Sequence, residues 1–329
     1  MTLLAPTLQA FFTDRLIGQR HASQNTISAY RDAFKLLLGF AAERVGTPPS
    51  RLEVADLDAD LVAAFLDHLQ HERGNSVTTR NARLAAIRSL FRFAALHHPE
   101  HAAVIERVLA IPPKRTDRTL IHYLTDPEID ALLAAPDTAT WTGRRDRALL
   151  TLAIQTGLRV SELTGLRCGD LQLGTGAHVA CRGKGRKERI TPLTRGTIDV
   201  LSTWLKERDG QADDPLFPSR RGSRLSRDAI ERRLVIHSGH AAEVCATLTR
   251  KKITAHVLRH TAAMQLLHAG VDTSVIALWL GHENVETTQI YLRADLALKE
   301  RALGRITPPN TSRGRYKAPD TILAFLDGL

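Results

Sequence analysis

The first hundred residues carry apolar side chains at the three- and four-residue spacing of amphipathic helices. One such series follows the cap candidate Asn25, and a second follows Asp58 or Asp60. A third helix is expected over about Val77 to Leu96, with an apolar stripe made of Leu84, Ile87, Leu90, Phe91 and Ala94. The pattern predicts an almost entirely helical N-terminal domain over residues 1–110.

The third of these helices is also strongly basic. Its arginines are Arg80, Arg83, Arg88 and Arg92, and no acidic residue lies between Val77 and Leu96. A solvated face is the ordinary explanation for any single charge run. Four arginines without an intervening acid favour contact with phosphate groups, so these residues are candidates for DNA binding.

A break in the apolar pattern divides the chain. The stretch 111–118, IPPKRTDR, opens with two prolines and has no helical periodicity, which is typical of a semi-rigid linker. We expect the linker over residues 111–120, with Lys114 and Arg115 as basic contacts. A larger domain follows over 121–301, and Thr125 and Glu128 have the spacing of a capping box at its first helix.

One β signal stands out in this larger domain. Short runs between His178 and Leu193 flank Gly183, Lys184 and Gly185, a sequence suited to a tight turn. This predicts a ribbon of two or three strands. The expected fold class is therefore mainly α with a small antiparallel β ribbon.

Charge and cysteine content narrow the function. The chain has 329 residues, enough for two domains, and its 45 Lys and Arg exceed its 35 Asp and Glu to give a net charge of +10. An excess of this size favours a polyanionic partner. The three cysteines are too few for a disulfide framework or a four-ligand zinc site, and no apolar run reaches the length of a membrane span. We expect a cytoplasmic, nucleoid-associated protein with inert thiols, and neither secretion nor membrane insertion.

Four short segments of the larger domain carry candidate chemistry. They are TGLRVSEL (156–163), RGKGRKER (182–189), HVLRH (256–260) and LGH (280–282), the last followed nine residues later by Tyr291. Each has an ordinary explanation when it is taken alone: a surface ion pair between Arg159 and Glu162, a generic phosphate patch, a structural histidine, a packing tyrosine. The cations beside the glycine turn, expected to contact phosphate groups, are Arg182, Arg186 and Lys187.

Taken together, these segments supply arginine, lysine, histidine and tyrosine, which are hydrogen-bond donors suited to a phosphate whose negative charge grows in a transition state. No group of Asp and Glu is spaced to hold Mg²⁺, so a two-metal nuclease is disfavoured and no metal is expected. A tyrosine phenol can then act as the nucleophile and form a covalent phosphotyrosine. Such an intermediate keeps the energy of the broken phosphodiester, and rejoining needs no nucleotide cofactor.

The ordered segments resemble the tyrosine recombinase (phage integrase) family, in the style of Xer recombinases, over roughly 123–301; the helical N-terminal domain resembles the family's SAM-like core-binding domain. The resemblance implies that Arg159 and Arg259 clamp the scissile phosphate, that Lys184 is the general acid for the leaving 5′-oxygen and that Tyr291 is the nucleophile. It further implies that His256 assists proton transfer from the nucleophile and that His282 donates a hydrogen bond to the phosphate. Glu162 would orient Arg159.

The resemblance implies site-specific breakage and rejoining of double-stranded DNA by a tetramer on two sites. The tail, 302–329, is longer than a minimal Xer protein needs and favours an integrase or transposon-type recombinase of a mobile element over a Xer-type dimer resolver. Less favoured alternatives are a type IB topoisomerase and a non-catalytic DNA-binding regulator. We expect the tail to be a tether with a short helix that supports self-association; the alternative is a helix that completes the core of its own subunit. A partner recombinase or an accessory protein is a further possible partner.

Overall fold

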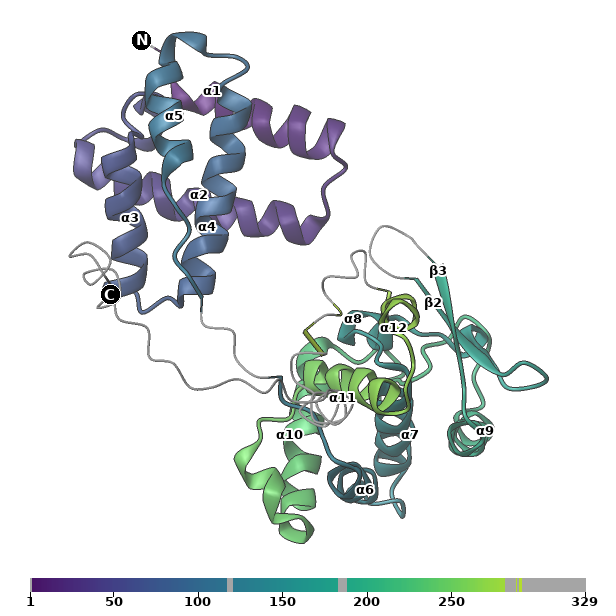
Figure 1. The fold of residues 1–329 in the computed structure, drawn as a ribbon. Helices are drawn as coiled ribbons and strands as arrows, with labels where there is room; N and C mark the ends of the chain where they lie inside the picture. Colours follow the sequence, from purple (N-terminus) through teal and green to yellow (C-terminus); the bar gives the residue numbers. More distant parts are fainter. Residues whose placement is uncertain (1, 117–120, 183–187, 282–287, 289, 292–329) are drawn as a thin grey trace, which may run out of the picture. The chain divides into compact units, whose positions relative to one another are not determined.

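The computed structural model describes residues 2–116, 121–182, 188–281, 288, 290 and 291. The chain divides into two compact units, Met1–Thr119 and Leu120–Leu329, and Figure 1 traces both along the sequence. The division falls inside the stretch 111–120 that the sequence marks as a linker. Each unit has a hydrophobic core of its own.

The first unit consists of helices joined by short turns. Its α-helices are α1 (Leu4–Ala10), α2 (Gln24–Val45), α3 (Ala59–His71), α4 (Val77–Ala94) and α5 (Ala102–Ala110). A π-helical segment, Phe11–Gln19, follows α1, and single 3-10 turns occupy Pro49–Arg51 and Pro99–His101. The apolar stripe predicted for α4 is buried, with each of its five side chains 3% exposed or less. The helical character expected for this domain is confirmed.

The structure corrects the predicted cap of α2 and identifies which of two candidates caps α3. α2 begins one residue before Asn25, and its cap is Ser23, whose hydroxyl accepts the N–H of Thr26 at 3.2 Å. Ser23 is extended, with φ of −63° and ψ of 150°, as a capping residue must be. α3 is capped by Asp58, which accepts the N–H of Leu61 at 2.8 Å, so Asp60 lies in the first turn.

The second unit is helical with one small sheet (Figure 1). Its α-helices are α6 (Asp126–Ala134), α7 (Trp141–Thr156), α8 (Val160–Gly165), α9 (Arg195–Arg208), α10 (Arg227–Val244), α11 (Ala255–His268) and α12 (Thr273–Leu280). Short 3-10 turns lie at Cys168–Asp170 and Ala246–Arg250. α7 packs against α9 and α11, and α11 packs against α12. The carboxyl end of α7, the start of α11 and the end of α12 therefore belong to one packed group.

The predicted capping box forms at the start of α6. Glu128 accepts the N–H of Thr125 at 2.8 Å. The same buried carboxylate accepts from the Lys251 ammonium at 2.6 Å and from the Thr247 hydroxyl at 2.7 Å. A signal that is local in sequence thus also connects α6 to the segment that precedes α11.

The sheet is antiparallel, in the order β1 (Leu171–Gln172), β2 (His178–Arg182) and β3 (Glu188–Pro192). Val179 lies opposite Thr191, and Cys181 lies opposite Arg189. These four side chains share the inward face of the sheet, because directly opposed residues point to the same side. The ribbon expected around the glycine turn is confirmed, although residues 183–187 lie outside the described part of the chain.

Two glycines end helices beside the functional residues. Gly157 follows α7 with φ of +63°, and a Cβ there would lie 2.6 Å from a methyl carbon of Leu280 and 3.1 Å from Cβ of Ala262. Gly281 follows α12 with φ of +66°, as expected for a helix that ends at a glycine. The first of these turns lets the end of α7 approach α11 and α12 more closely than any larger residue would allow.

We predict that Gly157→Ala destabilises the second unit by about 2 to 5 kcal/mol, because about 1 to 2 kcal/mol of left-handed strain is joined by a steric clash. The matched control is Gly176→Ala, since Gly176 has φ of +71° but no atom within 4 Å of the added Cβ. The control should be destabilised only by the left-handed strain, about 1 to 2 kcal/mol. Urea unfolding of both variants measures the difference, and equal losses would contradict the packing argument.

Candidate active site

Arg159 lies immediately before α8 in extended backbone, with φ of −66° and ψ of 151°. It therefore precedes the helix that carries Glu162. Oε2 of Glu162 accepts the backbone N–H of Arg159 at 2.7 Å, and Oε1 accepts from Nη1 at 3.0 Å. Nη2 donates to the carbonyl of Gly281 at 2.9 Å. The guanidinium is held in place while its side chain stays 36% exposed.

Arg259, on the first turns of α11, is almost completely buried. Its two terminal nitrogens donate to the carbonyls of Gly157 and Leu280, each at 2.7 Å. These carbonyls lie at the carboxyl ends of α7 and α12, where the helix dipole is negative and favours a cation. Burial, followed by the positive charge of Arg159, lowers the pKa of Arg259 to about 10. The group therefore remains a cation at neutral pH.

Arg189 is a functional residue that the sequence analysis missed. From β3 it binds Glu162 in a bidentate manner, with Nη1 donating to Oε1 and Nη2 donating to Oε2, both at 2.9 Å. A Cβ on Gly281 would lie 2.6 Å from Nη1 of Arg189, so this arginine also packs against the turn after α12. The available signal was the two-residue strand period, which places Arg189 on the same inward face as buried Cys181.

The Glu162 carboxylate is only 3% exposed. Burial by itself raises the pKa of Glu162, but the hydrogen bonds from Arg189 and from the Arg159 backbone, together with the charges of both arginines, outweigh it. The net result is a pKa below the usual value of 4.5. Glu162 is thus ionised at neutral pH and binds two guanidinium groups at once.

Two histidines of α11 and Tyr291 form the third part of the site. The rings of His256 and His260 are 4.2 Å apart at an angle of 69°, and Nδ1 of His260 is 3.1 Å from the Tyr291 hydroxyl oxygen. His256 is exposed to solvent. Partial enclosure of its ring, followed by the charges of Arg259 and Arg159, lowers the pKa of His256 from 6.5.

Tyr291 is buried, with 1% of its surface exposed. It packs in a cluster with Met264, Leu267 and Ile276 of α11 and α12. Burial raises the pKa of Tyr291 to about 12, although the charges of Arg259 and Arg159 act in the opposite direction. The phenol is therefore protonated at neutral pH, and it lies within electrostatic range of both arginines.

The structure brings together five of the predicted residues: Arg159, Glu162, His256, Arg259 and Tyr291. Lys184, Arg186, Lys187 and His282 lie outside the described residues. Arg182 ends β2. Within the described part of the chain, no group of three or more His, Cys, Asp and Glu could hold a metal ion.

The arginines of α4 make contacts inside the first unit. Arg80 is 5% exposed and its Nη1 donates to the carbonyl of Pro112 at 3.4 Å. Arg83 donates to the carbonyl of Ala29 at 3.0 Å, and Arg88 donates twice to the carbonyl of Leu109, at 2.6 and 3.1 Å. Arg92 is exposed. Three of the four predicted DNA contacts therefore already bind backbone carbonyls, and their DNA binding stays a prediction.

The start of the expected linker is fixed to α4. The side chain of Asn81 donates to the carbonyl of Lys114 at 2.8 Å and accepts the N–H of Lys114 at 3.1 Å. The Lys114 ammonium donates to Gln70 at 2.8 Å, whereas Arg115 is exposed. Both predicted DNA contacts are exposed, but the Lys114 ammonium is already bound by Gln70.

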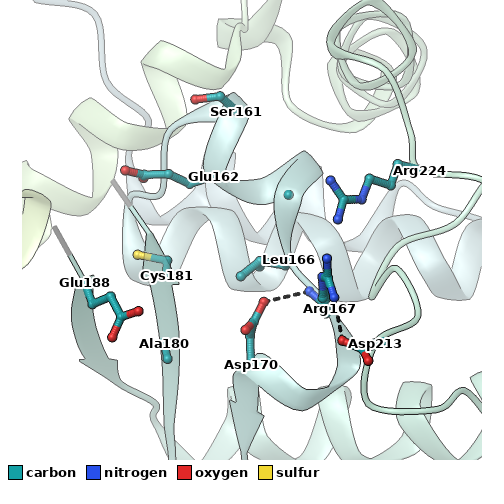
Figure 2. A pocket seen from close by; sticks show the side chains of 11 residues that line it. Ser161, Glu162, Leu166, Arg167, Asp170, Ala180, Cys181, Glu188, Asp213 and Arg224 are labelled. Atoms are coloured by element: carbon teal, nitrogen blue, oxygen red, sulfur yellow. Dashed lines mark hydrogen bonds and ion pairs between the residues drawn. The ribbon is translucent and has the colours of Figure 1, made fainter. Parts of the chain in front are cut away.

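A cavity of about 590 Å³ opens beside Glu162 (Figure 2). It is lined by residues of α8, β2 and β3 and by Arg167, Asp213 and Arg224, with Arg167 and Asp213 forming an ion pair. Cys181 also lines it, and burial raises the pKa of that thiol to about 11. Acidic and basic groups both line this cavity, so its walls do not select ligands of one charge.

Across the helices that the structure describes, none is both long and apolar enough to cross a membrane.

We predict that Glu162→Gln costs about 3 kcal/mol of unfolding free energy at neutral pH, because the guanidinium groups of Arg159 and Arg189 both lose the counter-charge of a buried carboxylate. The folded-state pKa of Glu162 is depressed, so its contribution is complete above about 4.5 and is lost as the pH falls through the folded-state value. The gap between wild type and variant should therefore narrow in acid.

The control is Glu231→Gln, which breaks an exposed pair with Arg227 and should cost less than about 1 kcal/mol. Denaturant unfolding at several pH values gives both comparisons. A gap that widened in acid would contradict the ionised, stabilising carboxylate.

Two family models match the chain. The model "Phage integrase family" matches residues 122–297, and "Phage integrase, N-terminal SAM-like domain" matches residues 10–98. The first match spans the described active-site residues, and the second spans most of the helical first unit.

Two relatives extend this likeness. The protein named "Putative integrase/recombinase y4rC" of Sinorhizobium fredii (strain NGR234) is 56% identical over 326 residues, which cover 99% of this chain and 98% of that protein. Tyrosine recombinase XerD of Vibrio cholerae is 33% identical over 288 residues, covering 85% of this chain and 89% of that protein.

Solved structures share the fold. The XerH site-specific recombinase bound to a palindromic difH substrate has a TM-score of 0.70 at 23% identity, covering 87% of this chain and 81% of that chain. A lambda integrase tetramer bound to a Holliday junction has a TM-score of 0.63 at 18% identity, covering 88% and 77%. The family models and the relatives together show that this chain belongs to the phage integrase family and is a tyrosine recombinase, a DNA strand-transferase enzyme.

Proposed function

We propose that this recombinase cleaves and rejoins specific sites in double-stranded DNA for a mobile element, with Tyr291 as the nucleophile. The observation that carries the proposal is the position of the Tyr291 phenol within electrostatic range of Arg259 and Arg159. Both guanidinium groups are fixed by carbonyls, and Arg159 is fixed by Glu162 as well. Rigid cations beside a phenol are suited to phosphoryl transfer to that phenol.

In the proposed reaction, the Tyr291 oxygen attacks the scissile phosphate and the bond from phosphorus to the 5′-oxygen breaks. The product is a 3′-phosphotyrosine and a free 5′-hydroxyl. Arg159 and Arg259 bind the phosphate oxygens as their charge grows. Lys184 protonates the leaving oxygen and His282 donates a hydrogen bond to the phosphate, roles proposed from the resemblance. His256 assists with proton transfer on the same grounds.

The charge balance of the described site supports a phosphate substrate. Arg159, Arg189 and Arg259 bring three positive charges, and Glu162 supplies one negative charge, so two positive charges remain. A phosphodiester brings one negative charge, and more charge develops on its oxygens during transfer. We further propose that Arg92 and Arg115, which are exposed, contact the DNA backbone, together with the cations at 182–187 beside the β ribbon and the remaining basic residues of α4 and the linker.

We predict that Tyr291→Phe abolishes covalent attachment to a nicked DNA site while DNA affinity changes less than about twofold, since one hydroxyl is a small part of a phosphate-dominated interface. A denaturing gel measures the covalent adduct, and filter binding measures affinity. The control is Tyr123→Phe, which alters another tyrosine of the same unit and should retain adduct formation. An adduct formed by the Tyr291→Phe protein would refute the assignment.

We propose that the enzyme assembles as a tetramer on two DNA sites, as the lambda integrase structure does on a Holliday junction. The tail 302–329 lies outside the described residues, and we assign it to contacts between subunits. A protein that ends at Arg315 should cleave a single site at the full-length rate but exchange two sites at least about tenfold more slowly. Two-site exchange at an unchanged rate would exclude a role for residues 316–329.

The match to y4rC supports a mobile-element role, because it spans 99% of this chain, whereas the match to XerD spans 85%. The relative named integrase/recombinase thus matches more of this chain than the Xer relative does. Inverted repeats or duplicated attachment sites beside the gene would support this role, and their absence would favour a dimer resolver. We propose that the enzyme acts on DNA in the cytoplasm, at the nucleoid, alone or with a second recombinase or accessory protein.

A further inference from the structure

The histidine that touches the nucleophile is His260, whose role neither the sequence motifs nor the family resemblance supplied. It follows Arg259 on α11 and is one helical turn after His256. Its Nδ1 is 3.1 Å from the Tyr291 oxygen, and the two rings meet edge to face with centroids 5.5 Å apart at 68°. The ring of His256 packs against the other histidine rather than forming a described hydrogen bond with the phenol.

This contact bears on a difficulty in the proposed reaction. Burial raises the pKa of Tyr291 to about 12, so the phenol must lose its proton during the attack. Only 1% of Tyr291 is exposed, which keeps bulk water from serving as the acceptor. A general base must be within about 2.6 to 3.2 Å of the proton donor, and Nδ1 of His260 meets that requirement.

We propose that His260 is the general base that accepts the Tyr291 proton. The proposal rests on the function proposed above, in which Tyr291 is the nucleophile. The O–H bond of Tyr291 breaks and its proton forms an N–H bond with Nδ1. The oxygen lone pair forms the bond to phosphorus, and the 5′-oxygen leaves with a proton from the general acid. The same imidazolium returns its proton to the phenolate oxygen when the 5′-hydroxyl attacks in the rejoining step.

The proposal requires the tautomer of His260 that carries its proton on Nε2, because Nδ1 must have a free lone pair to accept the phenol O–H. The proposal also gives His256 and His260 different roles. His256 is exposed and lies near the charged guanidinium groups of Arg259 and Arg159, so it assists the proton transfer indirectly, through its ring contact with His260. His260 is partly buried against the nucleophile.

The experiment compares His260→Ala and His260→Asn in full-length protein. Asparagine retains an oxygen near the position of Nδ1 that can accept the phenol hydrogen bond, but it cannot take up the proton. We expect both variants to form the covalent adduct on a nicked DNA site about 100-fold more slowly, within the range for loss of a general base. The control is His268→Asn, an exposed position on the same helix, which should react at the wild-type rate.

A second comparison replaces Tyr291 by a ring-fluorinated tyrosine, whose more acidic phenol depends less on a base. With fluorotyrosine at position 291, His260→Ala should slow adduct formation by only about tenfold or less. The deficit of Arg259→Lys should persist, because bidentate phosphate binding is not restored by a more acidic phenol. Thermal unfolding and DNA affinity of the His260 variants should stay near wild type, which separates lost chemistry from lost folding.

Three outcomes would overturn the proposal. A wild-type rate in His260→Asn would mean that the histidine only positions the phenol. An equal deficit with tyrosine and with fluorotyrosine would mean that the lost step is not proton removal. Rescue of His256→Ala by fluorotyrosine, without rescue of His260→Ala, would assign the base to His256. A wild-type protein that formed no adduct at Tyr291 would instead refute the proposed function itself, and this inference with it.

Discussion

One carboxylate, that of Glu162, organises the cationic site. Its two oxygens accept four hydrogen bonds: Oε1 from Nη1 of Arg159 and Nη1 of Arg189, and Oε2 from the Arg159 backbone and Nη2 of Arg189. A carboxylate offers about four lone-pair positions, so this buried group is fully satisfied. A buried ion pair is retained at little net cost only when its geometry is this complete. Two arginines can therefore bind the same buried carboxylate side by side.

The third arginine of the site, Arg259, depends on backbone geometry instead of a carboxylate. Its guanidinium binds carbonyls at the ends of α7 and α12, and these ends meet because Gly157 has no Cβ. One substitution at that turn would thus disturb both the cation and the helix that precedes Tyr291. Fixed donors of this kind need little reorganisation when charge develops on a phosphate, which is the main way in which such sites accelerate a reaction.

Features that depend on residues close together in the sequence were predicted, whereas contacts between residues far apart in the sequence were not. The capping box of Thr125 and Glu128 and the apolar stripe of α4 are local in sequence, and both were predicted correctly. The cap of α2 was placed at Asn25 instead of Ser23, because residues of equal capping propensity stand two positions apart. Arg189 and His260 were missed as partners of Glu162 and Tyr291, since those contacts span 27 and 31 residues and depend on how strands and helices pack. The sequence also could not show that Arg80 and Arg88 bind backbone carbonyls of the first unit. A basic helix face in the sequence gives the charge of the side chains but not their partners.

Cys181, on β2, determines how this strand responds to oxidants. It lies opposite Arg189 on β2 and lines the cavity beside Glu162. Because the pKa of its thiol is about 11, almost none of it is thiolate at neutral pH, and the thiolate is the form that reacts with peroxides and disulfides. The strand β2, which pairs with the strand that carries Arg189, is therefore protected from oxidation at Cys181, and the position of the arginine does not depend on the redox state of this thiol.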